Sequence, residues 1–90
     1  MTDHEIAATV EVLKGNFYYN TIILVTPRCI NFRGHTIRFR QGWVNLRNQS
    51  YTCNCPLDLL KAMAGTGIIR RKSVDFIHNQ IQIKLNKHSK

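Results

Sequence analysis

Carboxylate side chains are scarce in this 90-residue chain. Five Asp and Glu residues stand against thirteen Lys and Arg residues, for a formal net charge of +8. Hydrolytic acid–base catalysis needs two carboxylates in one cleft. The sequence offers no such pair, because three of the five crowd into the first eleven residues and the other two are isolated, so we expect no enzyme. The five are Asp3, Glu5, Glu11, Asp58 and Asp75.

Long apolar runs are also missing. No run approaches the roughly 18 residues that a membrane span needs, so we expect no membrane partner. Asp3 and Glu5 stand where an export signal would carry positive charge. The sequence therefore predicts an intracellular protein.

Cysteine is limited to three residues, Cys29, Cys53 and Cys55. An odd number argues against a complete set of intrachain disulfides and favours reduced thiols. A zinc set is the alternative: Cys53 and Cys55 would point the same way on an extended chain, and Cys29 with His35 would complete the set. Structural zinc sites usually use Cys-x2-Cys rather than Cys-x-Cys spacing. Free thiols are the favoured interpretation, and we expect no metal and no cofactor.

Two of the five glycines, Gly34 and Gly42, lie eight residues apart in "CINFRGHTIRFRQGWVNL". We expect each to close a two-residue turn, Arg33-Gly34 and Gln41-Gly42, between antiparallel strands. Counting outward from both turns predicts a three-stranded meander. The predicted cross-strand pairs are Phe32 with His35, Ile30 with Ile37, Phe39 with Val44, and Ile37 with Leu46.

This register sorts the meander side chains into two faces. One face is apolar and is predicted to form the core: Ile30, Phe32, Ile37, Phe39, Val44 and Leu46. The other face is polar and basic: Cys29, Asn31, Thr36, Arg38, Arg40, Trp43, Asn45 and Arg47. A slip of one residue would mix the two sets, so their clean separation supports the register.

Further elements flank the meander. The clearest helix is "PLDLLKAMAG", expected over 56–64, because Pro56 suits the first helical position and Gly65 suits the exit. Residues 18–26, "YYNTIILVT", are rich in β-branched and aromatic side chains and predict a buried strand. Residues 48–55 predict a loop that passes into a short extended piece.

The two ends of the chain are ambiguous. Residues 3–14 fit a helix or a strand, and their alanines favour the helix. In the tail, apolar residues fit a helix at 74–85, but "QIQIKL" alternates strictly and favours a hairpin that turns at His78-Asn79. Residues 86–90 predict a frayed basic end. We expect one α+β domain over 1–90, with an antiparallel sheet of about five strands.

Positive charge is concentrated after residue 27. Residues 1–27 hold three acids and one base, whereas residues 28–90 hold twelve bases and two acids. This asymmetry favours an anionic partner, either nucleic acid or an acidic protein surface. The polar face of the meander is the strongest candidate contact surface. Its predicted contact residues are Arg38, Arg40, Trp43, Asn45 and Arg47.

Two functions fit this surface. The first is an interaction or assembly protein, because Trp and Arg dominate protein–protein hot spots. The second is a nucleic-acid-binding module, in which Trp43 stacks on a base while guanidinium groups meet phosphates. A second basic cluster, Arg70, Arg71 and Lys72, would extend that module. The sequence leaves open whether Trp43 is exposed or covered by the N-terminal element or the tail, and a homo-oligomer or hetero-oligomer fits both functions.

The run "TIRFRQGWVNL…CPLDLLKAMAGTGII" within residues 30–69 resembles small bacteriophage proteins, in which a strand, a glycine turn and a second strand lead into a short helix. Such proteins are virion components, adaptors or proteins that bind host machinery. The resemblance implies a viral, non-catalytic role in the host cytoplasm or the virion. It carries over no functional residue.

Overall fold

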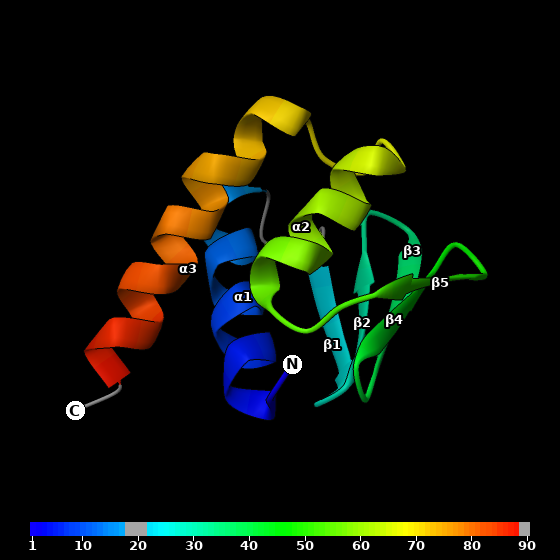
Figure 1. Ribbon diagram of the computed structural model, residues 1–90, viewed down its shortest axis with the longest axis horizontal. Coiled ribbons are helices and arrows are strands. Elements are labelled where there is room, and N and C mark those ends of the chain that lie inside the picture. The colour runs from blue at the N-terminus through cyan, green and yellow to red at the C-terminus, as the bar shows by residue number, and fades with distance from the viewer. Residues whose placement is uncertain (18–21, 89–90) are drawn as a thin grey trace.

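The computed structural model describes residues 1–17 and 22–88. One five-stranded antiparallel sheet packs against three helices (Figure 1). The predicted α+β class is therefore confirmed. The elements in chain order are α1 (Asp3–Asn16), β1 (Ile22–Thr26), β2 (Cys29–Phe32), β3 (His35–Arg40), β4 (Trp43–Leu46), β5 (Gln49–Thr52), α2 (Pro56–Gly65), the short 3-10 helix η2 (Arg71–Ser73) and α3 (Val74–His88).

The sheet is a simple meander in which each strand pairs with the next along the chain. All four predicted pairs between β2, β3 and β4 are confirmed. Both glycine turns are confirmed as well, with Gly34 at φ +84° and Gly42 at φ +79°. Glycine suits these positions because a Cβ atom disfavours positive φ. The six predicted core side chains of the meander are all buried.

A third tight turn adds the fifth strand. Arg47 and Asn48 both adopt positive φ, 55° and 64°, and this turn pairs β4 with β5. The sequence predicted only an extended piece in this region. Two consecutive left-handed residues match the right-handed twist of a hairpin, and asparagine tolerates that conformation better than most residues. Asn48 is therefore the residue in the sequence that could have indicated this turn.

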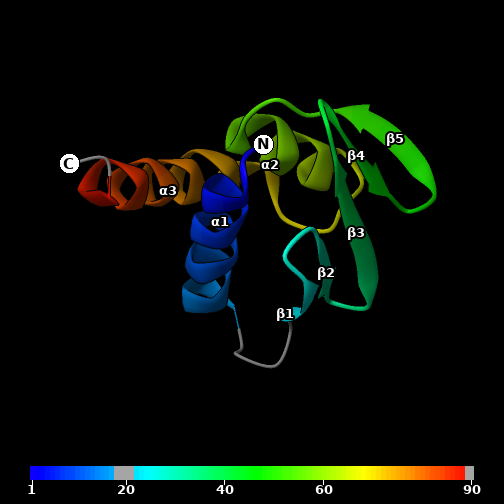
Figure 2. The same cartoon turned by 90° about the horizontal axis from the view of Figure 1, so that it is seen from below.

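All three helices lie on one side of the curved sheet (Figure 2). The sheet contributes its apolar face to a core that α2 fills with Leu59, Leu60 and Met63, and α1 with Ile6 and Leu13. The opposite face of β2–β5 carries no helix. Within residues 1–17 and 22–88, no helix combines the length and apolar character needed to cross a membrane.

The N-terminal element is the favoured helix, and it begins with a capping box. The Thr2 hydroxyl accepts from the Glu5 amide at 3.1 Å, and the Glu5 carboxylate accepts from the Thr2 amide at 2.9 Å. These bonds satisfy amides that the first helical turn leaves open. At the other predicted helix, α2 runs from Pro56 to Gly65, in agreement with the sequence.

The predicted hairpin in the tail is wrong, because residues 74–88 form the single helix α3. Its buried residues, Val74, Ile77 and Ile81, repeat at helical spacing and pack against α1 and α2. The alternation of "QIQIKL" is not used for burial, since Ile83 is 57% exposed. Residues 86–88, predicted as a frayed end, continue the helix, and residues 89–90 lie outside the described part of the chain. Residues 18–21 of the predicted first strand lie outside it too.

Candidate functional site

The outer face of β2–β5 is the surface on which the sequence placed its contact residues. Its side chains alternate with the buried ones along each strand. Most are exposed, and none is aliphatic or acidic. We define the outer face by Cys29, Asn31, Thr36, Arg38, Arg40, Trp43, Asn45, Ser50 and Thr52.

Trp43 and Arg40 stand opposite each other at one end of this face, beside the β3–β4 turn. The side chain of Trp43 is 39% exposed, so neither the N-terminal helix nor the tail covers it. Arg38 lies two residues before Arg40 on the same strand and pairs with Asn45 on β4. Among the described residues, the Arg38 and Arg40 guanidinium groups have no hydrogen bond or ion pair. Two cationic groups and a tryptophan are thus available to a partner.

Arg47, also predicted as a contact residue, is held differently. It lies in the β4–β5 turn, and its Nη1 donates to the Thr66 carbonyl at 2.9 Å. Its Nε and Nη2 lie 3.5 Å and 3.4 Å from the two ring nitrogens of His35. The imidazole lone pairs diverge, so these two short distances fit a guanidinium stacked on the ring rather than two hydrogen bonds. Arg47 therefore has a structural role in the turn.

Arg33 occupies the equivalent position in the β2–β3 turn, at φ 53°. Its Nη1 donates to the Ile68 carbonyl at 3.1 Å, and its guanidinium carbon lies 5.7 Å from the Phe17 ring centroid. The last turn of α2 has no basic residue of its own. Arg33 and Arg47 supply positive charge to the carbonyl-rich end of that helix. This role was not predictable from the sequence, because it depends on contacts between distant segments.

A polar pocket of about 350 Å³ lies where the outer face meets these two turns. We call it the corner pocket. Three of the predicted contact residues, Arg38, Asn45 and Arg47, contribute to it. The rest come from the start of β3 and from the two turns. Its lining is Gly34, His35, Thr36, Arg38, Asn45, Arg47 and Asn48.

The second basic cluster, Arg70, Arg71 and Lys72, is exposed at the start of η2. It follows the α2 exit loop, which Arg33 and Arg47 bind through Ile68 and Thr66. The cluster therefore lies toward the corner-pocket end of the sheet. Arg40 and Trp43 stand at the opposite end, so the structure does not merge the two predicted groups into one patch.

The acidic N-terminal segment leaves the outer face uncovered. Asp3 forms an ion pair with Arg28 in the β1–β2 turn, with 2.7 Å between Oδ1 and Nη1. Arg28 also donates to the Met1 carbonyl at 3.4 Å. Helix α1 itself packs on the opposite side of the sheet from the outer face (Figure 2). Among the described residues, none of its carboxylates forms an ion pair with Arg38 or Arg40.

The four residues of the possible zinc set do not come together. Cys29 lies on the outer face opposite Arg38, and His35 contacts Arg47. Cys53 is buried in the core, and Cys55 directly precedes α2 without a side-chain capping bond. In the described part of the chain, no three His, Cys, Asp or Glu side chains are placed to hold a metal ion. Burial raises the pKa of the Cys53 thiol from 9.0 to about 11, and the N-terminal ammonium opposes part of this rise.

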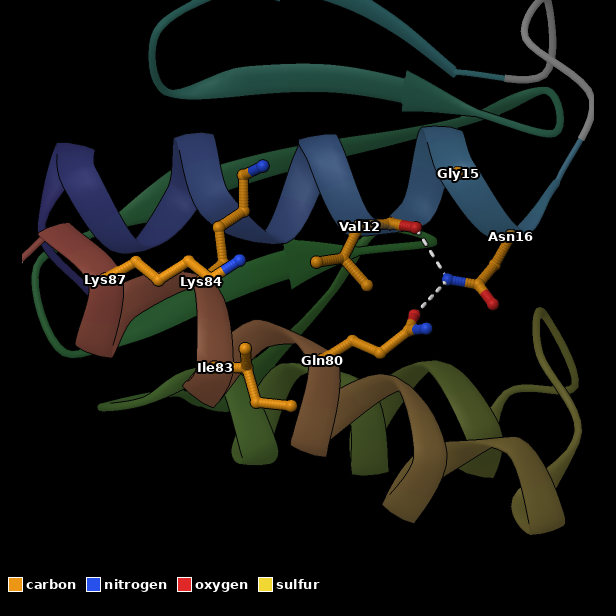
Figure 3. Close-up of a pocket in the computed structure, with 7 residues that line it drawn as sticks. All are labelled: Val12, Gly15, Asn16, Gln80, Ile83, Lys84 and Lys87. Atoms are coloured by element: carbon orange, nitrogen blue, oxygen red, sulfur yellow. Dashed lines mark hydrogen bonds between the residues drawn. The ribbon is translucent and has the colours of Figure 1, made fainter.

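A second hollow, of about 440 Å³, lies between α1 and α3 (Figure 3). Its polar amides already bind each other and the backbone: Asn16 Nδ2 donates to Gln80 Oε1 at 2.7 Å and to the Val12 carbonyl at 2.8 Å. Lys84 and Lys87 line it beside the exposed Ile83. The contacts between Asn16 and Gln80 join the two helices, so we assign this groove to helix packing.

Comparisons of the sequence with models of known protein families, with curated proteins and with solved structures found no match. The resemblance to small bacteriophage proteins therefore stays a prediction.

Proposed function

We propose that this chain is a non-enzymatic binding module that takes a single-stranded nucleic acid on the outer face of its sheet. The observation that carries the proposal is the exposed pair of Trp43 and Arg40, with Arg38 beside it. Single-strand-binding proteins combine aromatic side chains, which stack on bases, with cationic side chains, which bind the backbone. Both kinds of group are present here.

The charge around this pair supports a polyanionic partner. The sequence contains no Asp or Glu between Glu11 and Asp58, a stretch that includes the whole sheet. Nothing on the outer face therefore competes with phosphates for Arg38 and Arg40. Phosphate contacts by such side chains release condensed counterions, and this release drives binding at low salt.

The chemical composition of the face distinguishes nucleic acid from a protein partner. The cores of protein interfaces are rich in apolar side chains, with charged residues depleted. On the outer face of β2–β5, Trp43 is surrounded by arginine, asparagine, serine and threonine, with no aliphatic side chain. An acidic protein surface is the second candidate, since an exposed tryptophan beside arginines also suits a protein hot spot. A role in virion assembly or host binding would belong to this second candidate.

The proposal is tested by titrating the protein with a fluorescent oligothymidylate while monitoring polarisation and Trp43 emission. The chain has one tryptophan, so a change in tryptophan emission is assigned to Trp43. We expect saturable binding at low salt with quenched emission, and a loss of about 1–3 kcal/mol in Trp43→Ala. Lys14→Gln, which removes one exposed positive charge from α1, is the matched control and should change Kd by less than about twofold.

Two results would contradict nucleic-acid binding at this face. The first is polarisation that rises without any change in Trp43 emission. The second is an equal loss of affinity in Lys14→Gln and Arg40→Gln, which would indicate attraction by net charge alone. If no oligonucleotide binds but an acidic protein co-purifies in a Trp43-dependent manner, the second candidate function replaces the first.

A further inference from the structure

The corner pocket gathers hydrogen-bond donors that the protein itself does not use. Thr36, Arg38, Asn45 and Asn48 line it, and among the described residues none of their side chains makes a hydrogen bond. The α1–α3 groove differs in this respect, because its amides are paired with each other. Polar groups that converge on one pocket can fix the orientation of a ligand there.

One wall of the pocket is fixed before any ligand binds. Arg47 donates to the Thr66 carbonyl and stacks on His35, and these two contacts restrain its guanidinium. The bond to Thr66 uses one of its five N–H donors, and others remain for a ligand. A preorganised guanidinium loses less conformational entropy on binding than a free one.

The charge of the pocket selects the kind of anion. Arg38 and Arg47 both line it, and no carboxylate does. Two like charges around one small hollow repel each other, and an anion between them offsets that repulsion. A phosphomonoester carries about 1.5 to 2 negative charges at pH 7, whereas each phosphodiester in a chain carries one. The pocket therefore matches a terminal phosphate better than an internal one.

We propose that the corner pocket binds the terminal phosphate of the nucleic-acid strand whose bases reach Trp43. This inference rests on the proposed function. The strand β3 connects the two places: Thr36 lines the pocket, and Arg40 stands beside Trp43. Four residues of strand span roughly 14 Å, which corresponds to about four stacked nucleotides at 3.4 Å each. A strand anchored by its end can thus place a base on Trp43.

The test compares hexathymidylates that carry a 5′-phosphate, a 3′-phosphate or only hydroxyl ends, titrated into the full chain at fixed salt. We expect one phosphorylated end to tighten binding about tenfold, as two or three charge-assisted hydrogen bonds would. Arg38→Gln and Thr36→Val should each reduce that ratio, and the double variant should bring it close to one. Arg40→Gln is the matched control from the same strand and face: it should weaken all three ligands equally and keep the ratio.

Three outcomes would overturn the inference. If neither a 5′-phosphate nor a 3′-phosphate tightened binding relative to hydroxyl ends, there would be no terminal-phosphate site, and the proposed function would stand. An equal loss of the ratio in Arg38→Gln and Arg40→Gln would assign it to the general field of the face rather than to the pocket. A phosphoserine peptide that binds as tightly as the phosphorylated hexamer, without quenching Trp43, would assign the pocket to a protein partner.

A titration with inorganic phosphate separates the two proposals further. We expect saturable changes in the NMR amide signals of Gly34, Thr36 and Asn48, with no change near Lys14. If phosphate saturates these signals but no hexamer binds, the proposed function fails, and the terminal-strand assignment fails with it. If hexamers bind and phosphate shifts nothing in the pocket, the pocket assignment alone fails.

Discussion

Arg47 Nη1 donates to the Thr66 carbonyl at 2.9 Å, which joins the β4–β5 turn to the exit of α2. Arg33 makes the same kind of bond from the β2–β3 turn to Ile68. Both arginines occupy positive-φ positions that ordinarily disfavour residues with a Cβ atom. The bonds to the helix exit help to offset that cost. The arginines of this sheet thus have two different roles. Those in the two turns, Arg33 and Arg47, stabilise the fold, whereas those on β3 are available for binding.

This difference predicts different effects on stability. Arg47→Ala removes a charged hydrogen bond to a backbone carbonyl, and we expect it to lower the free energy of unfolding by about 1–3 kcal/mol. Arg40→Ala removes a side chain with no partner among the described residues, and the change should stay within about 0.5 kcal/mol. Urea denaturation followed by circular dichroism measures both. Equal midpoints for the two variants would refute the structural role of Arg47.

The helical conformation of the tail can be tested by whether one substitution raises or lowers the stability of the protein. Asn79 is exposed and lies inside α3, whereas the hairpin that the sequence favoured would place it in the turn. Alanine is the best helix former and a poor residue for a tight turn. We expect Asn79→Ala to stabilise the protein by about 0.5 kcal/mol in thermal or urea unfolding. A destabilised variant would favour the hairpin.

Salt dependence separates the two kinds of contact at the outer face. For a single strand, the slope of log K against log salt is negative, and each lost phosphate contact reduces its magnitude by about 0.7. We expect that change in Arg40→Gln and in Arg38→Gln. Trp43→Ala should weaken binding at every salt concentration and leave the slope unchanged, because stacking releases no counterion. A changed slope in Trp43→Ala would mean that the substitution disturbs the arginines.

The Cys53 thiol should be the least reactive of the three thiols. The thiolate is the nucleophile, and burial raises the pKa of Cys53 to about 11, while Cys29 and Cys55 are partly exposed. At pH 8 we expect iodoacetamide to modify Cys29 and Cys55 first, with Cys53 modified at a similar rate only in denaturant. Mass spectrometry of the digested protein identifies the sites. Rapid modification of native Cys53 would contradict its burial.

The same pKa predicts how stability changes in alkali. The folded protein keeps the Cys53 proton up to about pH 11, whereas an ordinary thiol of pKa 9.0 loses it earlier. Between these values the native state binds more protons than the unfolded state, so the free energy of unfolding falls as pH rises. Below pH 9 this group should contribute no pH dependence. Cys53→Ala should remove this decrease in the free energy of unfolding between pH 9 and 11. If the decrease persisted in the variant, it would be due to other groups.

Two glycines provide a matched test of the turn geometry. Gly34 has a φ of +84°, and we expect Gly34→Ala to destabilise the protein by about 1 kcal/mol or more. Gly15 is helical, and an added Cβ would meet nothing within 4 Å. Gly15→Ala should therefore stabilise the protein by about 0.5–1 kcal/mol. If Gly34→Ala left the stability unchanged or increased it, the positive-φ assignment of the β2–β3 turn would be wrong.

The register of the meander was predictable because residues close together in the sequence determine it. Gly34 and Gly42 mark the turns, and strict alternation between them separates the buried from the exposed side chains. The helix over 56–64 was predictable for a similar reason, since proline and glycine mark its two ends. For the same elements, the sequence also predicted which side chains would share the outer face, including Trp43 with Arg38 and Arg40.

The tail was not predictable from its own residues, because its apolar positions satisfy two periodicities at once. Val74, Ile77 and Ile81 fit a helix, and the alternating "QIQIKL" fits a strand. The choice depends on what is available to cover the apolar residues. Helices α1 and α2 offer a surface that a helical stripe can bury, and the meander is already complete with β5.

The sequence alone therefore determined the α+β class, the pairing of β2 to β4, the α2 helix and the basic character of the outer face, because turns, caps and alternation act over a few residues. Only the tertiary structure decided that Trp43 is exposed, that the tail is helical, and that Arg47 binds Thr66 while Arg38 stays available. These outcomes depend on contacts between segments far apart in the chain. The corner pocket belongs to the second group, because it exists only where two turns and two strands meet.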